Sequence, residues 1–466
     1  MMTMIREKYN QLNIAVLKVT KMKYFNEIYV AILAMITILG WKFSSNAGMI
    51  VMIILATISL LLTQDLKYVI PNCLYFIFIF SEGFKNDSFP IPLIVFGGIF
   101  AIIILFFSFK DGIHLKKMKS LIGLTGLALT TIIPIIWCRV PKENAVFYFL
   151  FFGNLGYLLL YMIMTNGMKE NGLDLLVVSM SYLVVILACE CGLKVYELRN
   201  TVDSILDLWY YLGWGLCNEA GIMICLSIPF AFYLLGKQEN LWGMIFQNFK
   251  IIIGALGIIL TMSRGSYLFG FAEIGIIYIV LMFFAKKARV YQNAFLVYFL
   301  AILLILICLR GRITNVLEGI MNTVFSDHFD DNGRMDLWKI GIDYWKSNPR
   351  NVIMGPGITC YLQYSMTQHG FVVTPMVFHS TLLETLAAGG IFGLIFLAIH
   401  LFEKYRNLKR TNTLLFVTVG IGFFIVDLYG LIDNTQHMYY FMLPLAIMLA
   451  TFDQCIQDKT RELDVA

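Results

Sequence analysis

The chain has 466 residues, of which 59% are hydrophobic and only 14% are charged. Soluble globular domains are about 45–50% apolar and about 25% charged, so this composition excludes a soluble globule. The apolar residues fall into many separate runs of roughly 15–25 residues without alternation, which excludes an outer-membrane barrel. The sequence therefore predicts an all-α integral membrane protein.

The charge and the cysteines exclude further classes of protein. The net charge of +5 does not indicate a nucleic-acid partner, because it comes from loops that we assign to the cytoplasm. The nine cysteines form no Cys-x-x-Cys pair and lie mostly in or beside apolar runs, as small core residues do. Walker A, dinucleotide and metal-ligand patterns are missing from the sequence, so we expect no cofactor.

Residues 1–23 are predicted to form an amphipathic helix on the cytoplasmic face of the membrane. Lysines interrupt its apolar stretch, so we expect a retained helix and not a cleaved signal. Apolar residues recur at steps of three and four, as in a helix that lies on an anionic leaflet. This stripe consists of Ile5, Tyr9, Leu12, Val16 and Val19.

About fourteen membrane helices are predicted to follow. An even number returns the C-terminus to the starting side. If that side is the cytoplasm, its loops carry the larger share of the 35 lysines and arginines, as the positive-inside rule requires. Both termini are therefore expected in the cytoplasm. The predicted spans are 24–41, 47–63, 66–81, 92–109, 120–137, 145–164, 172–191, 209–235, 248–262, 265–284, 291–309, 379–402, 413–432 and 438–452.

Residues 310–378 form the only long connection, which this topology places on the extracytoplasmic face. Charged residues in 334–346 step by three and four, which predicts an amphipathic helix over an apolar surface. Asn332 is a plausible N-cap and Pro349 ends the helix, after which residues 355–357 (Gly-Pro-Gly) form a tight turn. The apolar face is predicted to consist of Trp338, Ile342 and Trp345.

The predicted organisation has six regions. They are a surface helix (1–23), N-terminal membrane helices (24–204), membrane helices with the Ser-Arg-Gly turn (205–309), the extracytoplasmic catalytic loop (310–378), C-terminal membrane helices (379–452) and a cytoplasmic tail (453–466).

Two arginines near the outer face are candidate ligands for a phosphate. Arg264 lies in a very short turn, where its guanidinium either binds a phosphate or anchors the membrane interface. Arg334 lies in the first turn of the loop helix, where a cation opposes the helix dipole unless an anion binds there too. A solvated loop arginine is the alternative for Arg334.

His379 is predicted to open a membrane helix. A histidine at a helix N-terminus favours its neutral form, which a general base needs, although a buried structural histidine fits the sequence as well. The other five histidines show no ligand spacing. We expect Arg264, Arg334 and His379 to face one cavity at the outer side of the membrane. Its other lining residues are expected to be Asn218, Glu219, Ser263, Trp338, Gly355, Gly357, Asp433, Asn434 and His437.

Five short motifs together resemble the O-antigen ligase and polymerase family. They are Thr-x-Ser-Arg-Gly (261–265), Gly-Arg-x-x-x-Trp (333–338), Gly-Pro-Gly (355–357), His-Ser-x-x-Leu-Glu (379–384) and Gly-Gly-Ile-Phe-Gly (389–393). The resemblance spans about 205–450, roughly half of the chain. The commonest family form has asparagine after the histidine, whereas this chain has Ser380, so any role of that amide is not carried over.

The resemblance implies a GT-C-like glycosyltransferase that joins glycans built on undecaprenyl diphosphate, without metal or nucleotide sugar, at the outer face of the bacterial inner or plasma membrane. In such enzymes two arginines hold the donor diphosphate and a histidine activates the acceptor hydroxyl. Carried over by motif, these residues are Arg264, Arg334 and His379.

We therefore expect a Wzy-type polysaccharide polymerase for O-antigen or capsule, with lipid-linked donor and acceptor and a chain-length regulator protein as a possible partner. The nearest alternative is a ligase with lipid A core or protein as acceptor. The polymerase is preferred because six basic and six acidic residues balance each other in 310–378, leaving no basic patch for a phosphorylated core. A flippase is the second alternative, but its polar groups should lie near mid-membrane.

Overall fold

The computed structural model describes residues 25–81, 91–137, 153–201, 210–284, 334–357, 362–367, 370–375, 378–435 and 437–465. The predicted surface helix 1–23, the predicted span 291–309 and the proposed N-cap Asn332 lie outside these residues.

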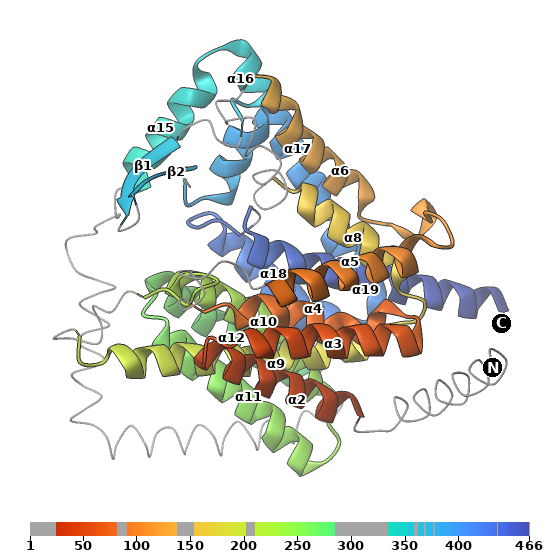
Figure 1. Cartoon of the computed structure of the whole chain (residues 1–466). Coiled ribbons are helices and arrows are strands. Elements are labelled where there is room, and N and C mark those ends of the chain that lie inside the picture. Colours follow the sequence, from red (N-terminus) through yellow and green to blue (C-terminus); the bar gives the residue numbers. More distant parts are fainter. Residues whose placement is uncertain are drawn as a thin grey trace.

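Within the described residues the fold is a bundle of helices with one short β-hairpin (Figure 1). The first half contains α2 (Phe25–Lys42), α3 (Asn46–Thr63), η1 (Leu66–Val69), α4 (Ile70–Phe76), η2 (Ile77–Ile79), α5 (Ile91–Phe109), η4 (Leu115–Lys117), α6 (Leu121–Ile132), η5 (Ile133–Ile136), α8 (Leu155–Gly167) and α9 (Leu173–Leu198). The second half contains α10 (Cys217–Lys237), α11 (Leu241–Leu260), α12 (Arg264–Phe284), α15 (Arg334–Lys346), α16 (Pro349–Met354), β1 (Leu362–Thr367), β2 (Gly370–Pro375), α17 (Thr381–Thr411), α18 (Thr413–Tyr429) and α19 (Tyr439–Val465).

Eight of the described helices are long and apolar enough to cross a membrane, which makes this a multi-pass membrane protein. They are Asn46–Thr63, Ile91–Phe109, Leu173–Leu198, Cys217–Lys237, Leu241–Leu260, Arg264–Phe283, Thr381–Thr411 and Tyr439–Thr460. Shorter apolar helical segments cover Leu66–Ile79, Leu121–Ile136, Leu155–Gly167 and Thr413–Tyr429. The total of fourteen spans stays a prediction.

The start of the predicted helix 209–235 is wrong. Residues 210–216 form a tight turn closed by an isolated bridge between Tyr211 and Leu216, and α10 begins at Cys217. Gly213 takes a φ of +101° there, and a Cβ on it would lie 2.3 Å from the carbonyl carbon of Ser81. The apolar run continues through this turn, so hydropathy could not reveal where the helix begins.

α10 lies at the centre of the bundle, where it contacts α9, α11, α12 and α18. Its contact with α12 depends on Gly221, because a Cβ there would lie 1.8 Å from Ser266 Oγ. Small residues let two membrane helices approach closely, as they do here. The N-terminal ends of α10 and α12 are therefore neighbours.

The predicted amphipathic helix of the long loop is confirmed as α15, which runs from Arg334 to Lys346. Its packed face differs from the prediction, however. Trp338 and Gly341 lie against Phe378 and α17, whereas Ile342 is 37% exposed and does not belong to this face. Gly341, Trp338 and Arg334 are three and four residues apart, so Arg334 lies on the packed face of the helix as well.

The loop helix ends where predicted, but the segment that follows it differs from the prediction. α15 ends at Lys346, and Pro349 opens the short helix α16 with Asn348 as its N-cap. Proline is favoured in the first turn of a helix because its missing N–H has no partner there anyway. The antiparallel hairpin of β1 and β2 follows, and it was not predicted.

The Gly-Pro-Gly turn fits against a kink in α17. Gly355 and Gly357 have φ values of +79° and +108°, and the kink residue Gly390 has a φ of +62°. A Cβ on Gly390 would lie 2.5 Å from the backbone nitrogen of Gly355. Gly357 N–H donates to the carbonyl oxygen of Ala387 at 3.0 Å. Two backbones thus meet where no side chain can stand between them.

Replacement of Gly390 by alanine is expected to lower the free energy of unfolding by about 1–3 kcal/mol, because it combines a left-handed backbone with a steric clash. The matched control is Gly420→Ala in α18, whose new Cβ would make only ordinary contacts, the nearest at 3.6 Å. Thermal unfolding of purified protein in nanodiscs measures the difference. Equal midpoints for the two variants would contradict this explanation of the kink.

Candidate active site

His379 lies beside an aspartate that comes from a distant part of the sequence. Its Nδ1 is 3.2 Å from Oδ1 of Asp433, and its side chain is 39% exposed. His379 does not open the helix as predicted. It lies two residues before α17 in a left-handed conformation, with a φ of +49°, and Ser380 is the N-cap. Because serine caps helices well, the helix begins after Ser380 and the imidazole projects from a turn.

Arg334 approaches the same aspartate from the loop helix. Its Nη1 donates to the carbonyl oxygen of Ile432 at 2.7 Å, and its Nη2 is 3.8 Å from Oδ2 of Asp433. A quarter of the Arg334 side chain remains exposed. The Asp433 carboxylate thus stands between a guanidinium and an imidazole, with one oxygen toward each.

The segment that carries Asp433 is bound to the first turn of α17 by its backbone. The N–H of Thr381 donates to the carbonyl oxygens of Gly430 and Asp433, at 2.7 and 3.1 Å. In the other direction, Thr435 N–H donates to Thr381 Oγ1 at 2.9 Å. Asn434 N–H donates to Oδ1 of Asp433, also at 2.9 Å. These bonds fix the carboxylate relative to His379.

Arg264 is held in the same region by its neighbours. The hydroxyl of Tyr429, at the end of α18, lies 2.9 Å from Ser263 Oγ and 3.1 Å from Ser266 Oγ. A Cβ on Gly265 would lie 2.7 Å from the Tyr429 ring, so this residue has to be glycine. Tyr429 also precedes Asp433 by one helical turn, and its carbonyl accepts the Asp433 N–H at 3.0 Å.

The guanidinium of Arg264 itself is exposed, and it forms no hydrogen bond or ion pair with any of the residues described above. Its backbone is therefore fixed by Ser263 and Gly265, while its side chain is available to a ligand. Together with Arg334, it gives this end of the bundle two partly or fully exposed guanidinium groups, which suit an anionic ligand.

Glu219 belongs to the same cluster. Its Oε2 accepts the Leu216 N–H in the first turn of α10, and the carboxyl lies close enough to Asp433 and His379 for their charges to interact. The neighbouring Asn218 is half-buried in the same turn. Tyr210 fixes this turn by donating to the carbonyl oxygen of Leu260 at 2.8 Å. Burial raises the pKa of the Tyr210 hydroxyl well above its ordinary range, so it remains a donor.

Other predicted site residues lie in supporting positions. Trp338 Nε1–H donates to the carbonyl oxygen of Phe378 at 2.8 Å, which fixes the residue before His379. Gly355 and Gly357 contact the backbone of α17 near its kink and not the Asp433 cluster. Asn434 and His437 are both buried, and Asn434 Oδ1 accepts the His437 N–H at 3.2 Å.

Two supporting residues were missed by the sequence analysis. Glu384, which ends the His-Ser-x-x-Leu-Glu motif, is buried and accepts the Phe378 N–H at 3.0 Å. The motif contained it, but nothing in the spacing indicated that it would bind a backbone group six residues away. Tyr429 gave no signal, because a tyrosine at the end of an apolar run is common in membrane proteins.

The cluster can bind an anion and move a proton. Its cations are Arg264 and Arg334, and its carboxylates are Asp433 and Glu219. The imidazole of His379 has one nitrogen beside Asp433, and its Nε2 has no partner among the described residues. Within the part of the chain that the structure describes, no group of three His, Cys, Asp or Glu side chains is placed to hold a metal ion.

Residues 249–398 match the family described as O-antigen ligase. This segment is roughly a third of the chain and contains Arg264, Arg334 and His379, whereas Asp433 lies beyond it. The protein thus carries an O-antigen ligase domain, and the family resemblance is confirmed. The family indicates a glycosyltransferase-like membrane enzyme of polysaccharide biosynthesis with lipid-linked oligosaccharide substrates. No curated protein matches the chain.

Replacement of Tyr429 by phenylalanine is expected to lower the free energy of unfolding by about 1–2 kcal/mol, because two buried serine hydroxyls lose a common partner. Tyr196→Phe is the matched control, since that tyrosine is 62% exposed on α9. Thermal unfolding of both variants measures the effect. If Tyr429→Phe were as stable as the control, Tyr429 would not be what holds the Ser-Arg-Gly turn.

Proposed function

We propose that the protein is a polysaccharide polymerase of the GT-C kind. It transfers a glycan from undecaprenyl diphosphate to the non-reducing end of another lipid-linked repeat unit, with inversion and without metal. The observation that carries this proposal is the Asp433 carboxylate, which lies beside both His379 and Arg334 at the end of the bundle where Arg264 is exposed.

The proposal includes an extracytoplasmic site, cytoplasmic termini, about fourteen spans and the six sequence regions given above, with 310–378 as the catalytic loop. The placement of the site on one face is supported by the alternating direction of successive helices. The cluster gathers the first turns of α10, α12 and α17 with the last turn of α18. α15 and the hairpin lie beyond this end, away from the C-terminal end of α19 (Figure 1). The distribution of lysines and arginines among the loops assigns the end of the bundle with the cluster to the outer face.

In the proposed reaction the two arginines bind the donor diphosphate. As the bond between the anomeric carbon and the diphosphate oxygen breaks, negative charge develops on the leaving group. Guanidinium groups fixed beforehand stabilise that charge more in the transition state than in the ground state. The Arg334 guanidinium is held by the Ile432 carbonyl, whereas the short turn fixes the backbone of Arg264 and leaves its guanidinium exposed to the diphosphate. Undecaprenyl diphosphate then leaves.

His379 is the proposed general base. The acceptor hydroxyl oxygen attacks the anomeric carbon and gives its proton to Nε2 of the neutral imidazole. The Asp433 carboxylate accepts a hydrogen bond from Nδ1–H, which selects the tautomer with a free Nε2, and it stabilises the imidazolium that forms. Asp433 is thus a positioning residue. A single displacement at the anomeric carbon inverts its configuration.

A polymerase is preferred over a ligase because basic and acidic residues balance in the catalytic loop. A ligase for a phosphorylated lipid core needs cations that are not neutralised within the protein. The basic residues are Arg310, Arg312, Arg334, Lys339, Lys346 and Arg350, and the acidic ones are Glu318, Asp327, Asp330, Asp331, Asp336 and Asp343.

The direct test incubates purified protein with the undecaprenyl-diphosphate repeat unit extracted from its source cells, without nucleotide or metal. We expect a ladder of polymer products. His379→Ala should slow transfer by about 10²–10⁴-fold, as loss of a general base does. Arg264→Ala and Arg334→Ala should each slow it by about 10²–10³-fold.

Arg199→Ala is the control, because this exposed arginine stacks on Tyr196 at the end of α9, outside the cluster. It should leave the ladder unchanged. A folded parent that makes no ladder but loads lipid A core would be a ligase. A ladder that survives His379→Ala would remove the base from the mechanism.

Asp433→Asn is expected to lower the maximal rate by about 10²–10⁴-fold, as loss of a carboxylate that orients a general-base imidazole does in the serine proteases. The asparagine keeps an acceptor for the His379 Nδ1–H but loses the charge that stabilises the imidazolium. Asp336→Asn on the exposed side of α15 is the matched control. Initial rates at saturating substrate measure the effect, and equal rates for the two variants would remove Asp433 from the proposed mechanism.

A further inference from the structure

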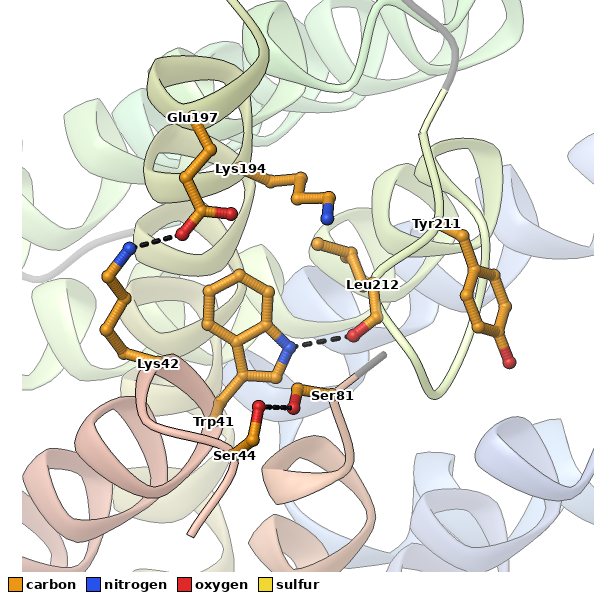
Figure 2. Close-up of a pocket in the computed structure, with 8 residues that line it drawn as sticks. All are labelled: Trp41, Lys42, Ser44, Ser81, Lys194, Glu197, Tyr211 and Leu212. Carbon is orange, nitrogen blue, oxygen red and sulfur yellow. Dashed lines mark hydrogen bonds and ion pairs between the residues drawn. The ribbon is translucent and has the colours of Figure 1, made fainter. Parts of the chain in front are cut away.

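A polar cavity lies near the end of the bundle that carries the candidate active site. It has a volume of about 220 Å³ and is formed by the C-terminal ends of α2 and α9, residue Ser81 and the turn before α10 (Figure 2). Its lining consists of Trp41, Lys42, Ser44, Ser81, Lys194, Glu197, Tyr211 and Leu212. None of these residues belongs to the His379 cluster.

The walls of this cavity are held by contacts between segments far apart in the sequence. Trp41 Nε1–H donates to the carbonyl oxygen of Leu212 at 2.8 Å, so the indole is fixed and 4% exposed. The hydroxyls of Ser44 and Ser81 are 2.7 Å apart. In Figure 2 both pairs lie below Lys194 and Glu197 of α9. A cavity built in this way exists before any ligand arrives.

The α9 side of the cavity carries charged groups of both signs. Lys194 and Glu197 extend from the last turns of α9, one helical turn apart, and Glu197 forms an ion pair with Lys42 (Figure 2). The Glu197 side chain is 41% exposed and that of Lys42 is 32% exposed, so water and ligands reach both. The cavity therefore offers ammonium donors, a carboxylate acceptor and hydroxyls within one small space.

This chemistry suits a sugar ring. A sugar presents several hydroxyls that both donate and accept hydrogen bonds, and it needs partners of both kinds, whereas an acyl chain needs neither. Cavities for drug-sized ligands measure roughly 300–1,000 Å³. A cavity of about 220 Å³ accordingly holds one sugar unit and not an oligosaccharide.

The cavity is joined to the candidate active site through a single turn of the chain. Leu212 lines the cavity, and Leu216, at the other end of that turn, donates its N–H to Glu219 beside His379 and Asp433. Tyr439 OH donates to the carbonyl oxygen of Trp214 and supports the turn from the side of α19. The cavity and the His379 cluster are therefore linked by the residues of one short turn.

We propose that this cavity is a glycan subsite that binds one sugar unit of a lipid-linked substrate, away from the bond that reacts. The inference rests on the proposed function and adds to it the place where a remote part of the glycan is held. The sugar comes from the donor glycan or from the acceptor repeat unit, because both present the same hydroxyl chemistry.

The test uses the full-length protein in nanodiscs and the variants Lys194→Met and Glu197→Gln. The matched control is Arg199→Gln, a charge change at the same end of α9 but outside the cavity. KM and kcat are measured separately for donor and acceptor, both extracted from the source cells. We expect KM for one of the two substrates to rise about tenfold in the cavity variants, which corresponds to about 1.4 kcal/mol, with kcat unchanged. The substrate whose KM rises identifies the source of the sugar.

A second measurement tests glycan binding in the cavity independently of the transfer reaction. Oligosaccharides prepared by partial hydrolysis of the polysaccharide of the source cells are tested for binding to the His379→Ala protein by saturation-transfer NMR. We expect binding that Glu197→Gln weakens and Arg199→Gln does not. This result supports the subsite even if the parent forms no polymer, so failure of the proposed function is recognised separately.

Three outcomes would overturn the proposal. The first is an active parent whose cavity variants keep both KM values. The second is fragment binding that Glu197→Gln leaves unchanged. The third is displacement of the fragments by phosphatidylglycerol added to the nanodiscs but not by phosphatidylcholine, which would identify the cavity as a site for an anionic lipid headgroup.

Discussion

One buried carboxylate holds the candidate site together. Asp433 is 7% exposed, and a charge withdrawn from water is costly unless other groups compensate it. Here the compensation comes from the Asn434 N–H, from Arg334 at 3.8 Å and from His379 at 3.2 Å. The loop helix and the turn before α17 are both fixed by their contact with this group. The arrangement of both depends on the position of Asp433 between them.

The surrounding helices meet this requirement through backbone hydrogen bonds and through close contacts at glycines. Thr381 N–H is shared between two carbonyl oxygens of the 430–433 segment. Gly221 brings α10 against α12, and Gly265 accommodates Tyr429. Gly390 meets the loop at Gly355. At each of these three glycines the missing side chain allows a close approach, and the polar groups that would line a ligand are carried on backbones with little freedom to move.

The turn at 210–216 connects the two functional regions that we propose. One end of it lines the polar cavity through Leu212, and the other leads into the first turn of α10 with Glu219. Trp214 Nε1–H donates to the buried carboxyl of Glu190 at 2.8 Å, so the turn is also fixed to α9. A rigid turn between the cavity and His379 keeps the two proposed binding regions at a constant separation.

The amino-acid sequence by itself determined the membrane class, the approximate positions of the described apolar helices and the helix from Arg334 to Lys346. These features depend on the length and periodicity of apolar runs, which are local properties. Arg264, Arg334 and His379 were found through short motifs. Only the tertiary structure decided that Asp433 joins two of them, that Trp338 fixes the Phe378 backbone and that α10 begins at Cys217. Each of these depends on contacts between residues far apart in the chain or on backbone geometry inside an apolar run, and neither leaves a periodic pattern in the sequence.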